Sequence, residues 1–392
     1  MAKLGDIATI QSGGTPARSI AEYWEDGTIP WVKISDIKSK HLNQTEEMIT
    51  EVGLENSSAK IFPKGTILYT IFATLGETSI LDINAATNQA IAGISITDSR
   101  VLPDYLYYYL LSQKIHVQKI GRGVAQNNIN MKLLRDFDVP LPSKEAQLNI
   151  IEQLNRVTEL LFLRKQQLTK LDELIKARFV EMFGDMLLNS LEWPEKPLEG
   201  LADIVSGITK GRKTTETGLI EVPYMAVSNV KSGYIDWTTI KTILATKQEI
   251  EQYRLMPDDI LMTEGGDPDK VGRGAIIKNP LKDSIHQNHI FRVRLDKSEL
   301  LPAYFAEYLQ HQKAKRYFLG CAKQTTGIAS INMRQLRALP VLIPPLPLQN
   351  QFADFVAKVD KSKLFVGSAV AHKPFDIEFF SKSTVQRPIK EV

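Results

Sequence analysis

Several features common in other protein classes are scarce in this 392-residue sequence. Its only cysteine is Cys321, so no disulfide can form within the chain. No apolar run approaches the roughly 18 residues that a membrane-spanning helix needs. The opening residues, MAKLGDIATI, lack the basic flank and apolar core of a secretory signal. These absences predict a cytoplasmic protein that does not associate with a membrane.

Neither sign of charge is in large excess. The chain has 48 Lys and Arg against 45 Asp and Glu, which gives a net charge of +3. Any polyanionic partner must therefore be met by local basic clusters and not by a broadly positive surface. With 43% hydrophobic and 24% charged residues, the composition is that of an ordinary globular protein, long enough for two or three domains.

Motifs that hold nucleotides, methyl donors or catalytic metals are also missing. No glycine-rich loop ends in the Gly-Lys-Ser/Thr that cradles ATP phosphates. Pro344 and Pro345 follow Ile343, which excludes the Asn/Asp-Pro-Pro-aromatic motif of amino-methyltransferases. His286 and His289 stand three residues apart, but a zinc site needs three or four ligands and no others support this pair. We therefore predict no catalytic residue, no metal site and no cofactor bound by this chain.

What the sequence does contain is a long internal repeat. The segments INMKLLRDFDVPLPSKEAQ, from Ile129, and INMRQLRALPVLIPPLPLQ, from Ile331, are identical at eight of nineteen positions. Ordinary composition would give about one identity by chance. LGDIATIQSG similarly matches LEGLADIVSG, and IPWVKISDI matches VPYMAVSNV. The pattern predicts a duplicated domain and not a short-period solenoid.

Each copy has the same expected elements. Alternating segments such as WVKIS, TILYTIF and IAGISIT indicate strands. A helix is expected after Pro103 and again after Pro302, because proline suits the first helical turn. The tyrosines of that helix recur four residues apart, at Tyr105 and Tyr109 in the first copy, and this spacing favours packing over base stacking.

Between the two copies the hydrophobic period changes to that of a helix. Apolar residues recur at alternating steps of four and three, interrupted only by Arg164. This is a heptad pattern, which requires a partner helix, and the segment after the second copy is the natural candidate. The pattern of that second helix fades after Leu364. The predicted seam comprises Ile150, Leu154, Val157, Leu161, Leu168, Leu171 and Ile175 in the central helix, and Phe352, Phe355 and Val359 in the distal helix.

In their order, doubling and spacing, these segments resemble the DNA-specificity subunits of type I restriction–modification systems. The resemblance rests on LGDIATIQSGGTP, IPWVKISDI, DDILMTEGGD and AQNNINMKLLRDFDVPLPSKEAQ. It implies an α+β fold in which two similar mixed α/β target-recognition domains, related by a pseudo-two-fold repeat, are separated by long antiparallel coiled-coil helices. The expected parts are a first recognition domain (1–142), a central helix (143–186), a second recognition domain (187–344), a shortened distal helix (345–366) and an atypical tail (367–392).

The resemblance also implies a function and a set of partners. The chain would be a noncatalytic subunit that binds double-stranded DNA, with each repeat reading one half of a bipartite target. The helices would set the spacer and dock two methyltransferase subunits. S-adenosylmethionine, ATP and Mg would then be bound by the methyltransferase and restriction subunits. Self-association through the helices is a further expected contact. Two alternatives remain, namely a tandem-domain scaffold without DNA specificity and an enzyme with diverged motifs.

Residues that contact DNA are expected in clusters of basic and amide side chains. Lys and Arg neutralise phosphates, whereas Arg can read guanine and Asn or Gln can read adenine. The alternative is that these residues are solvated loop charges. Lys33 aligns with Ala226, as expected if divergent loops on a shared scaffold read different half-sites. The predicted DNA-binding residues are Lys33, Ser35, Asp36, Lys38, Lys40, Arg122, Gln126, Asn127, Lys210, Arg212, Lys213, Ser228, Asn229 and Lys231.

Overall fold

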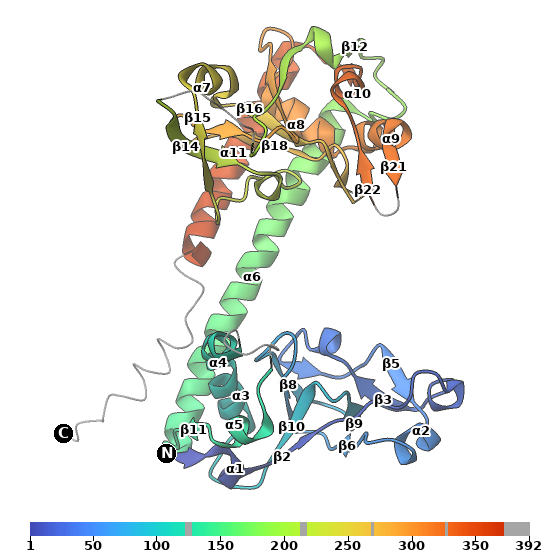
Figure 1. Ribbon diagram of the computed structural model, residues 1–392, viewed down its shortest axis with the longest axis vertical. Coiled ribbons are helices and arrows are strands. Elements are labelled where there is room, and N and C mark those ends of the chain that lie inside the picture. Colours follow the sequence, from blue (N-terminus) through green and yellow to red (C-terminus); the bar gives the residue numbers. More distant parts are fainter. Residues whose placement is uncertain (122–127, 212–217, 268–269, 326–327, 372–392) are drawn as a thin grey trace, which may run out of the picture. The chain divides into compact units, whose positions relative to one another are not determined.

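The computed structural model describes residues 1–121, 128–211, 218–267, 270–325 and 328–371 (Figure 1). The chain divides into two compact units, unit 1 with residues 1–164 and unit 2 with residues 165–368. Five of the predicted DNA-binding residues lie outside the described residues: Arg122, Gln126, Asn127, Arg212 and Lys213. Most of the predicted tail, 367–392, also lies outside them. Among the described residues, no helix combines the length and the apolar character needed to cross a membrane.

Unit 1 is built on two main sheets and one small one. A five-stranded sheet has the order β2-β10-β7-β8-β4, a four-stranded sheet has the order β5-β3-β9-β6, and β1 pairs with β11. The central strands β7 and β8 are buried along their whole length, so their residues form the core. The strands are β1 (Ala2–Lys3), β2 (Ala8–Ser12), β3 (Ile29–Val32), β4 (His41–Leu42), β5 (Glu47–Ile49), β6 (Ile61–Phe62), β7 (Ile67–Thr70), β8 (Thr78–Leu81), β9 (Ala85–Thr87), β10 (Ile91–Ile96) and β11 (Asp138–Val139).

The helices of unit 1 pack against its sheets and lead into the central helix. The helix after Pro103 is present and packs against β7 and β8. The helices are α1 (Leu4–Ile7), α2 (Glu51–Glu55), α3 (Pro103–Ser112), α4 (Lys114–Gly121), α5 (Met131–Arg135) and the first part of α6 (Lys144–Phe183), with short 3-10 turns η1 (Ala21–Tyr23) and η2 (Ile34–Asp36).

Unit 2 repeats this plan. Its four-stranded sheet has the order β13-β20-β16-β18, and three-stranded sheets have the orders β15-β14-β19 and β17-β22-β21. The strands are β12 (Glu195–Pro197), β13 (Ala202–Ser206), β14 (Ile220–Met225), β15 (Lys241–Ala245), β16 (Asp259–Thr263), β17 (Gly265–Gly266), β18 (Gly274–Ile277), β19 (Ile285–His286), β20 (Ile290–Leu295), β21 (Lys323–Thr325), β22 (Ile328–Ser330) and β23 (Pro340–Leu342). The helices are α7 (Lys247–Tyr253), α8 (Pro302–Gln310), α9 (Gln312–Cys321), α10 (Met333–Arg337) and α11 (Leu346–Ala371), with η3 (Leu198–Gly200) and η4 (Val227–Asn229).

Strand pairing confirms that the two units are copies of one fold. In unit 1, β3 pairs antiparallel with β5 and parallel with β9. In unit 2, β14 pairs antiparallel with β15 and parallel with β19. The equivalent strands β10 and β20 are each flanked by antiparallel neighbours. The sequence repeat therefore preserves an irregular mixture of parallel and antiparallel pairs.

The closing segment of each copy is repeated because it joins the domain to its long helix. Gln147 of α6 accepts a hydrogen bond from Leu102 N at 2.9 Å and donates to the carbonyl of Pro142 at 3.0 Å. Gln349 of α11 makes the same pair of bonds, to Leu301 N at 2.8 Å and to the carbonyl of Pro344 at 2.8 Å. Both glutamines are fully buried, so replacing either amide would leave backbone groups unsatisfied.

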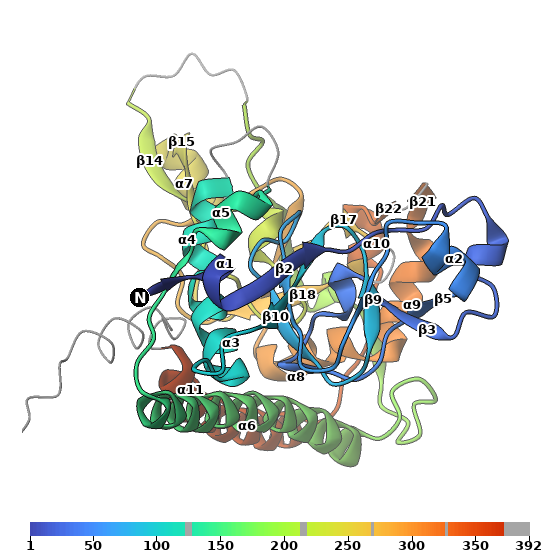
Figure 2. The same ribbon diagram turned by 90° about the horizontal axis from the view of Figure 1, so that it is seen from below.

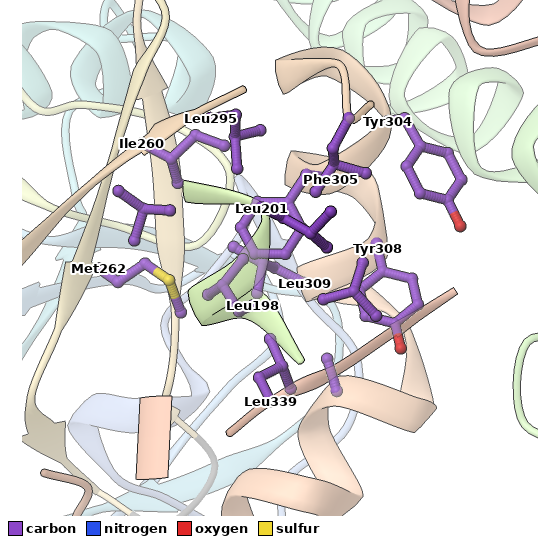
Figure 3. Close-up of a cluster of buried hydrophobic side chains, with 14 of the residues drawn as sticks. Leu198, Leu201, Ile260, Met262, Leu295, Tyr304, Phe305, Tyr308, Leu309 and Leu339 are labelled. Carbon is purple, nitrogen blue, oxygen red and sulfur yellow. The ribbon is translucent and has the colours of Figure 1, made fainter. Parts of the chain in front are cut away.

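The repeated tyrosines are structural, as predicted. The hydroxyl of Tyr105 donates to the carbonyl of Pro140 at 2.9 Å, and that of Tyr304 donates to the carbonyl of Leu342 at 2.9 Å. Figure 3 shows Phe305 of α8 on the side facing Ile260 of β16 and Tyr304 and Tyr308 on the side away from it, all within one cluster of buried side chains. These side chains form the core of unit 2 and leave no base-stacking platform on this face of α8.

Two helices run antiparallel within unit 2. The predicted central helix, 143–186, is α6, and the predicted distal helix, 345–366, is α11, which extends to Ala371. Figures 1 and 2 both show α11 beside the second half of α6. The rings of Phe179 and Phe352 lie 5.4 Å apart, and Lys363 pairs with Asp172 at 2.6 Å.

The predicted seam is only partly a contact between helices. Ile175, Phe352 and Val359 belong to the core of unit 2, with Leu171 and Phe355 packed against it. Leu154 instead belongs to the core of unit 1, and Ile150 packs against that core. The assignment of these two residues to a helix–helix seam was therefore wrong, because a sheet domain covers them. Val157, Leu161 and Leu168 are half-buried.

Candidate nucleic-acid interface

In unit 1, the loops that follow β2, β3, β7 and β9 meet at one end of the sheets. Gly14 N donates to the carbonyl of Thr87 at 2.9 Å, and Asn88 N donates to the carbonyl of Val32 at 3.0 Å. Ile71 N, directly after β7, donates to the carbonyl of Ala90 at 2.9 Å. Backbone bonds therefore hold four separate loops together, and we call this group the loop cluster of unit 1.

Unit 2 builds the same loop cluster from β13, β14, β16 and β19. Ile208 N donates to the carbonyl of His286 at 2.9 Å, and Gln287 N donates to the carbonyl of Met225 at 3.0 Å. Glu264, equivalent to Ile71, donates its N–H to the carbonyl of His289 at 3.0 Å. The side chains on a shared backbone frame thus differ between the units.

The turns η2 and η4 present the residues predicted from SDIK and SNVK. Lys33 N donates to a carboxylate oxygen of Asp36 at 2.9 Å, and Ala226 N donates to the side-chain oxygen of Asn229 at 2.9 Å. Each turn is therefore closed by its third residue. Ser35 and Ser228, the middle residues of the two turns, are exposed.

Two acidic residues hold the cations around η2. Lys33 Nζ lies 2.9 Å from Glu46 and 2.8 Å from Glu47, and the hydrogen bonds that it donates to Glu47 and Glu46 raise the pKa of Lys33. The same lysine lowers the pKa of both carboxyl groups. Lys38 is more exposed and lies 3.5 Å from Glu46. Arg18, which the sequence did not single out, pairs with Glu47.

Arg18 is ordered by aromatic stacking as well as by charge. Its guanidinium lies 3.7 Å from the ring centroid of Trp24 and 4.9 Å from that of Trp31. Trp31 is buried and donates its indole N–H to the carbonyl of Gly14 at 3.0 Å. Since cation–π contacts fix a planar guanidinium, Arg18 is held at the edge of the loop cluster.

Lys40 is a scaffold residue, which corrects its prediction as a DNA contact. Its side chain is 19% exposed and forms an ion pair with Asp104 of α3. Its ammonium also donates to the amide oxygen of Asn155 on α6 at 3.0 Å and lies 4.8 Å from the ring centroid of Tyr108. These contacts tie β4, α3 and α6 together inside unit 1.

Asn229 is likewise a scaffold residue and not a base reader. It is 3% exposed, and its side-chain N–H groups donate to the carbonyls of Asp236 and Thr239, each at 2.9 Å. Its N–H groups therefore close the next loop, while its side-chain oxygen closes η4. Lys231 lies 3.9 Å from Asp236, whereas Ser228 and Lys210 are exposed.

Strand register reveals a charge difference that the sequence alignment missed. Trp31 pairs with Glu47 across β3 and β5, and the equivalent Tyr224 pairs with Lys241 across β14 and β15. Glu47 and Lys241 thus occupy the same place in the two units with opposite charge. Because Lys33 is also replaced by alanine in unit 2, the ion pair of unit 1 has no counterpart there, and Lys241 is exposed.

The histidine pair of unit 2 does not form a metal site. His286 is fully buried, with Nδ1 at 3.2 Å from the carbonyl of Tyr253 and Nε2 at 3.3 Å from that of Val205. His289 is exposed and bonds Glu264 at 2.6 Å. In the described part of the chain, no three His, Cys, Asp or Glu side chains gather where they could hold a metal ion.

We predict that His286 makes unit 2 sensitive to acid. Burial lowers its pKa to about 4, below the unfolded value of about 6.5. The unfolded chain therefore binds the proton more readily, so this residue's contribution to stability is present above pH 6.5 and is lost as the pH falls towards 4. The expected loss between pH 7 and pH 4 is about 3 kcal/mol.

The test is urea unfolding of the wild type and His286→Thr at several pH values. Threonine occupies the equivalent position, Thr87, in unit 1. At pH 7 the variant should be less stable than the wild type, because the carbonyls of Tyr253 and Val205 lose their contacts with the imidazole. Between pH 7 and pH 4, however, the free energy of unfolding of the variant should fall less than that of the wild type. Parallel pH profiles for the two proteins would contradict the prediction.

Comparisons with known proteins agree with the duplicated architecture. The family model described as type I restriction modification DNA specificity domain matches residues 1–173 and again residues 190–365. The type I restriction enzyme MjaIX specificity subunit of Methanocaldococcus jannaschii is 26% identical, over 90% of this chain and 85% of its own length. The EcoKI specificity subunit of Escherichia coli is 21% identical, over 92% of this chain and 81% of its own length.

Solved structures show the same fold. The S subunit of a type I restriction-modification system from M. genitalium superposes with a TM-score of 0.50 at 15% identity, covering 98% of this chain and 94% of its own. A chain solved in work on complex assembly and conformational transition of the type I R-M system gives a TM-score of 0.56 at 16% identity, covering 98% and 95%. With both copies matched by its model, this chain belongs to the type I restriction modification DNA specificity family.

Proposed function

We propose that this chain is the DNA-recognition subunit of a type I restriction–modification complex, with each unit reading one half of a bipartite target. The observation that carries the proposal is the loop cluster, built twice on the same backbone bonds but with different side chains. A shared frame keeps the geometry of docking, while divergent side chains permit different base sequences to be read.

The two units would engage DNA with different electrostatics. In unit 1, Lys33 and Arg18 are already paired with carboxylates, so few cations are available for phosphates. In unit 2, Lys210 and Lys241 are exposed on the equivalent side. Because each neutralised phosphate releases counterions, unit 2 would supply more of the salt-dependent affinity.

The helices would connect the reading of DNA to the other subunits. We propose that α6 and α11 set the spacer, since one helical turn of about 5.4 Å corresponds to roughly 1.5 base pairs at 3.4 Å each. Exposed apolar side chains on α6, such as Leu160, Phe162 and Leu163, support docking of methyltransferase subunits. Restriction subunits would join that assembly.

The chemistry would reside in those partners. We propose that this chain is noncatalytic and that S-adenosylmethionine, ATP and Mg are bound by the methyltransferase and restriction subunits. The absence of nucleotide and methyl-donor motifs in the sequence supports this division of labour.

The direct test is to co-express the chain with its methyltransferase subunit and to map methylated bases across a host genome. We expect a split motif with two defined halves and a fixed gap. A palindromic motif would show that one unit, supplied by two chains, does the reading. A stable complex that methylates without sequence preference would refute the proposal in favour of a scaffold.

A further inference from the structure

Unit 1 contains a cavity beside η2, where the two units differ in how the neighbouring loop is held. The cavity has a volume of about 250 Å³ and lies between Asp36 and Lys38 on one side and the loop Asn43–Glu46 on the other. That loop connects β4 to β5, and sequence reasoning did not single it out. The cavity adjoins the loop cluster through η2.

One difference between the two copies lies beside this space. In unit 2, the side-chain N–H groups of Asn229 bond the carbonyls of Asp236 and Thr239 and pull the loop against η4. The equivalent residue of unit 1 is Asp36, whose carboxylate accepts but cannot donate to a carbonyl. The side chain of Asp36 therefore does not tie the loop of unit 1 to η2, and instead accepts the bond from Lys33 N, while the loop is held through Glu46 by Lys33 and Lys38.

The cavity is lined by hydrogen-bonding groups, several of them available to a ligand. Asn43 and Gln44 are exposed, and within the described chain neither side chain has a hydrogen-bond or ion-pair partner. Glu46 is held in place by Lys33 at 2.9 Å and Lys38 at 3.5 Å. The wall thus combines free amides with two carboxylates whose positions are fixed.

We infer that this cavity binds the amine-bearing edge of an adenine or cytosine in the half-site read by unit 1. Amides pair with adenine through N6 and N7, and carboxylates accept from the N4 amine of cytosine. The carbonyl oxygens of guanine and thymine would face the carboxylates of Asp36 and Glu46. Because both groups are hydrogen-bond acceptors, these two bases would be disfavoured. The inference rests on the proposed function, because it assigns one base position within that recognition.

The test uses the complete complex and two variants of unit 1. Asp36→Asn restores the donor present in unit 2, so it should tie the loop down, close the cavity and keep the bond from Lys33 N. Asn43→Ala, combined with Gln44→Ala, leaves the cavity open but removes its free amides. Methylation rates are measured on duplexes in which each base pair of both half-sites is changed in turn.

Each variant should reduce discrimination roughly 10- to 100-fold at one base pair of a single half-site, where the wild-type complex should prefer adenine over thymine, or cytosine over guanine, on one strand. Asn56→Ala, which removes an exposed amide of unit 1 that does not line the cavity, should leave every position unchanged. Unaltered discrimination in both variants, or an equal loss at all positions of both half-sites, would overturn the inference. A wild-type complex without any base preference would instead refute the proposed function.

Discussion

Phe179→Ala is expected to lower the free energy of unfolding of unit 2 by about 3–5 kcal/mol. The ring is 1% exposed and stands at the meeting point of three elements. Its centroid lies 5.0 Å from that of Phe183 on α6, 5.4 Å from that of Tyr304 on α8 and 5.4 Å from that of Phe352 on α11. Alanine would remove the ring and leave a cavity that rigid helices cannot fill.

Val180→Ala is the matched control, because it removes a side chain from the next position of the same helix. Val180 is 48% exposed, so its replacement should change stability by about 0.5 kcal/mol or less. Urea unfolding followed by circular dichroism and tryptophan fluorescence measures both effects. Equal unfolding midpoints for the two variants would show that the aromatic cluster does not hold α6 and α11 together.

The sequence predicted this helix pair but not its centre. The alternating steps of four and three correctly placed Ile175 and Phe352 on buried faces. Phe179 and Phe183 follow Ile175 at two successive steps of four, which departs from the alternating pattern, and the predicted seam omitted them. Periodicity identifies a buried face without identifying what buries it. Leu154 was therefore assigned to the seam between two helices, although the sheet domain of unit 1 covers it.

The candidate interface was less predictable than the fold for a related reason. Charged and amide side chains in loops can meet solvent, DNA or their own chain, and sequence does not distinguish these partners. Lys40 and Asn229 were misassigned because they bond residues distant in sequence or backbone carbonyls. The opposite charges of Glu47 and Lys241 became visible only through strand register, since loop insertions obscure the alignment.

Gly13→Ala and Gly207→Ala are each expected to disrupt one loop cluster. A Cβ on Gly13 would lie 2.2 Å from the carbonyl oxygen of Thr87, and a Cβ on Gly207 would lie 2.0 Å from that of His286. Contacts below 3.0 Å to backbone atoms force the backbone to move. The bonds from the next residues, Gly14 and Ile208, to these same carbonyls would then be strained or lost.

Because both clashes demand shifts of about 1 Å at the edge of a reading surface, each variant should lower methylation of the target by roughly 100-fold. The loss should arise from weaker DNA binding, measured by titrating the assembled complex with target duplex. Gly200→Ala is the control, since its Cβ would meet nothing within 4 Å. One contrary result would be that the complexes carrying Gly13→Ala and Gly207→Ala both methylate the target as fast as the complex that carries Gly200→Ala. That result would show that the close approach between these loops does not position the DNA-reading side chains. If only one of them fails, a single unit suffices for recognition, and the duplication serves assembly more than reading.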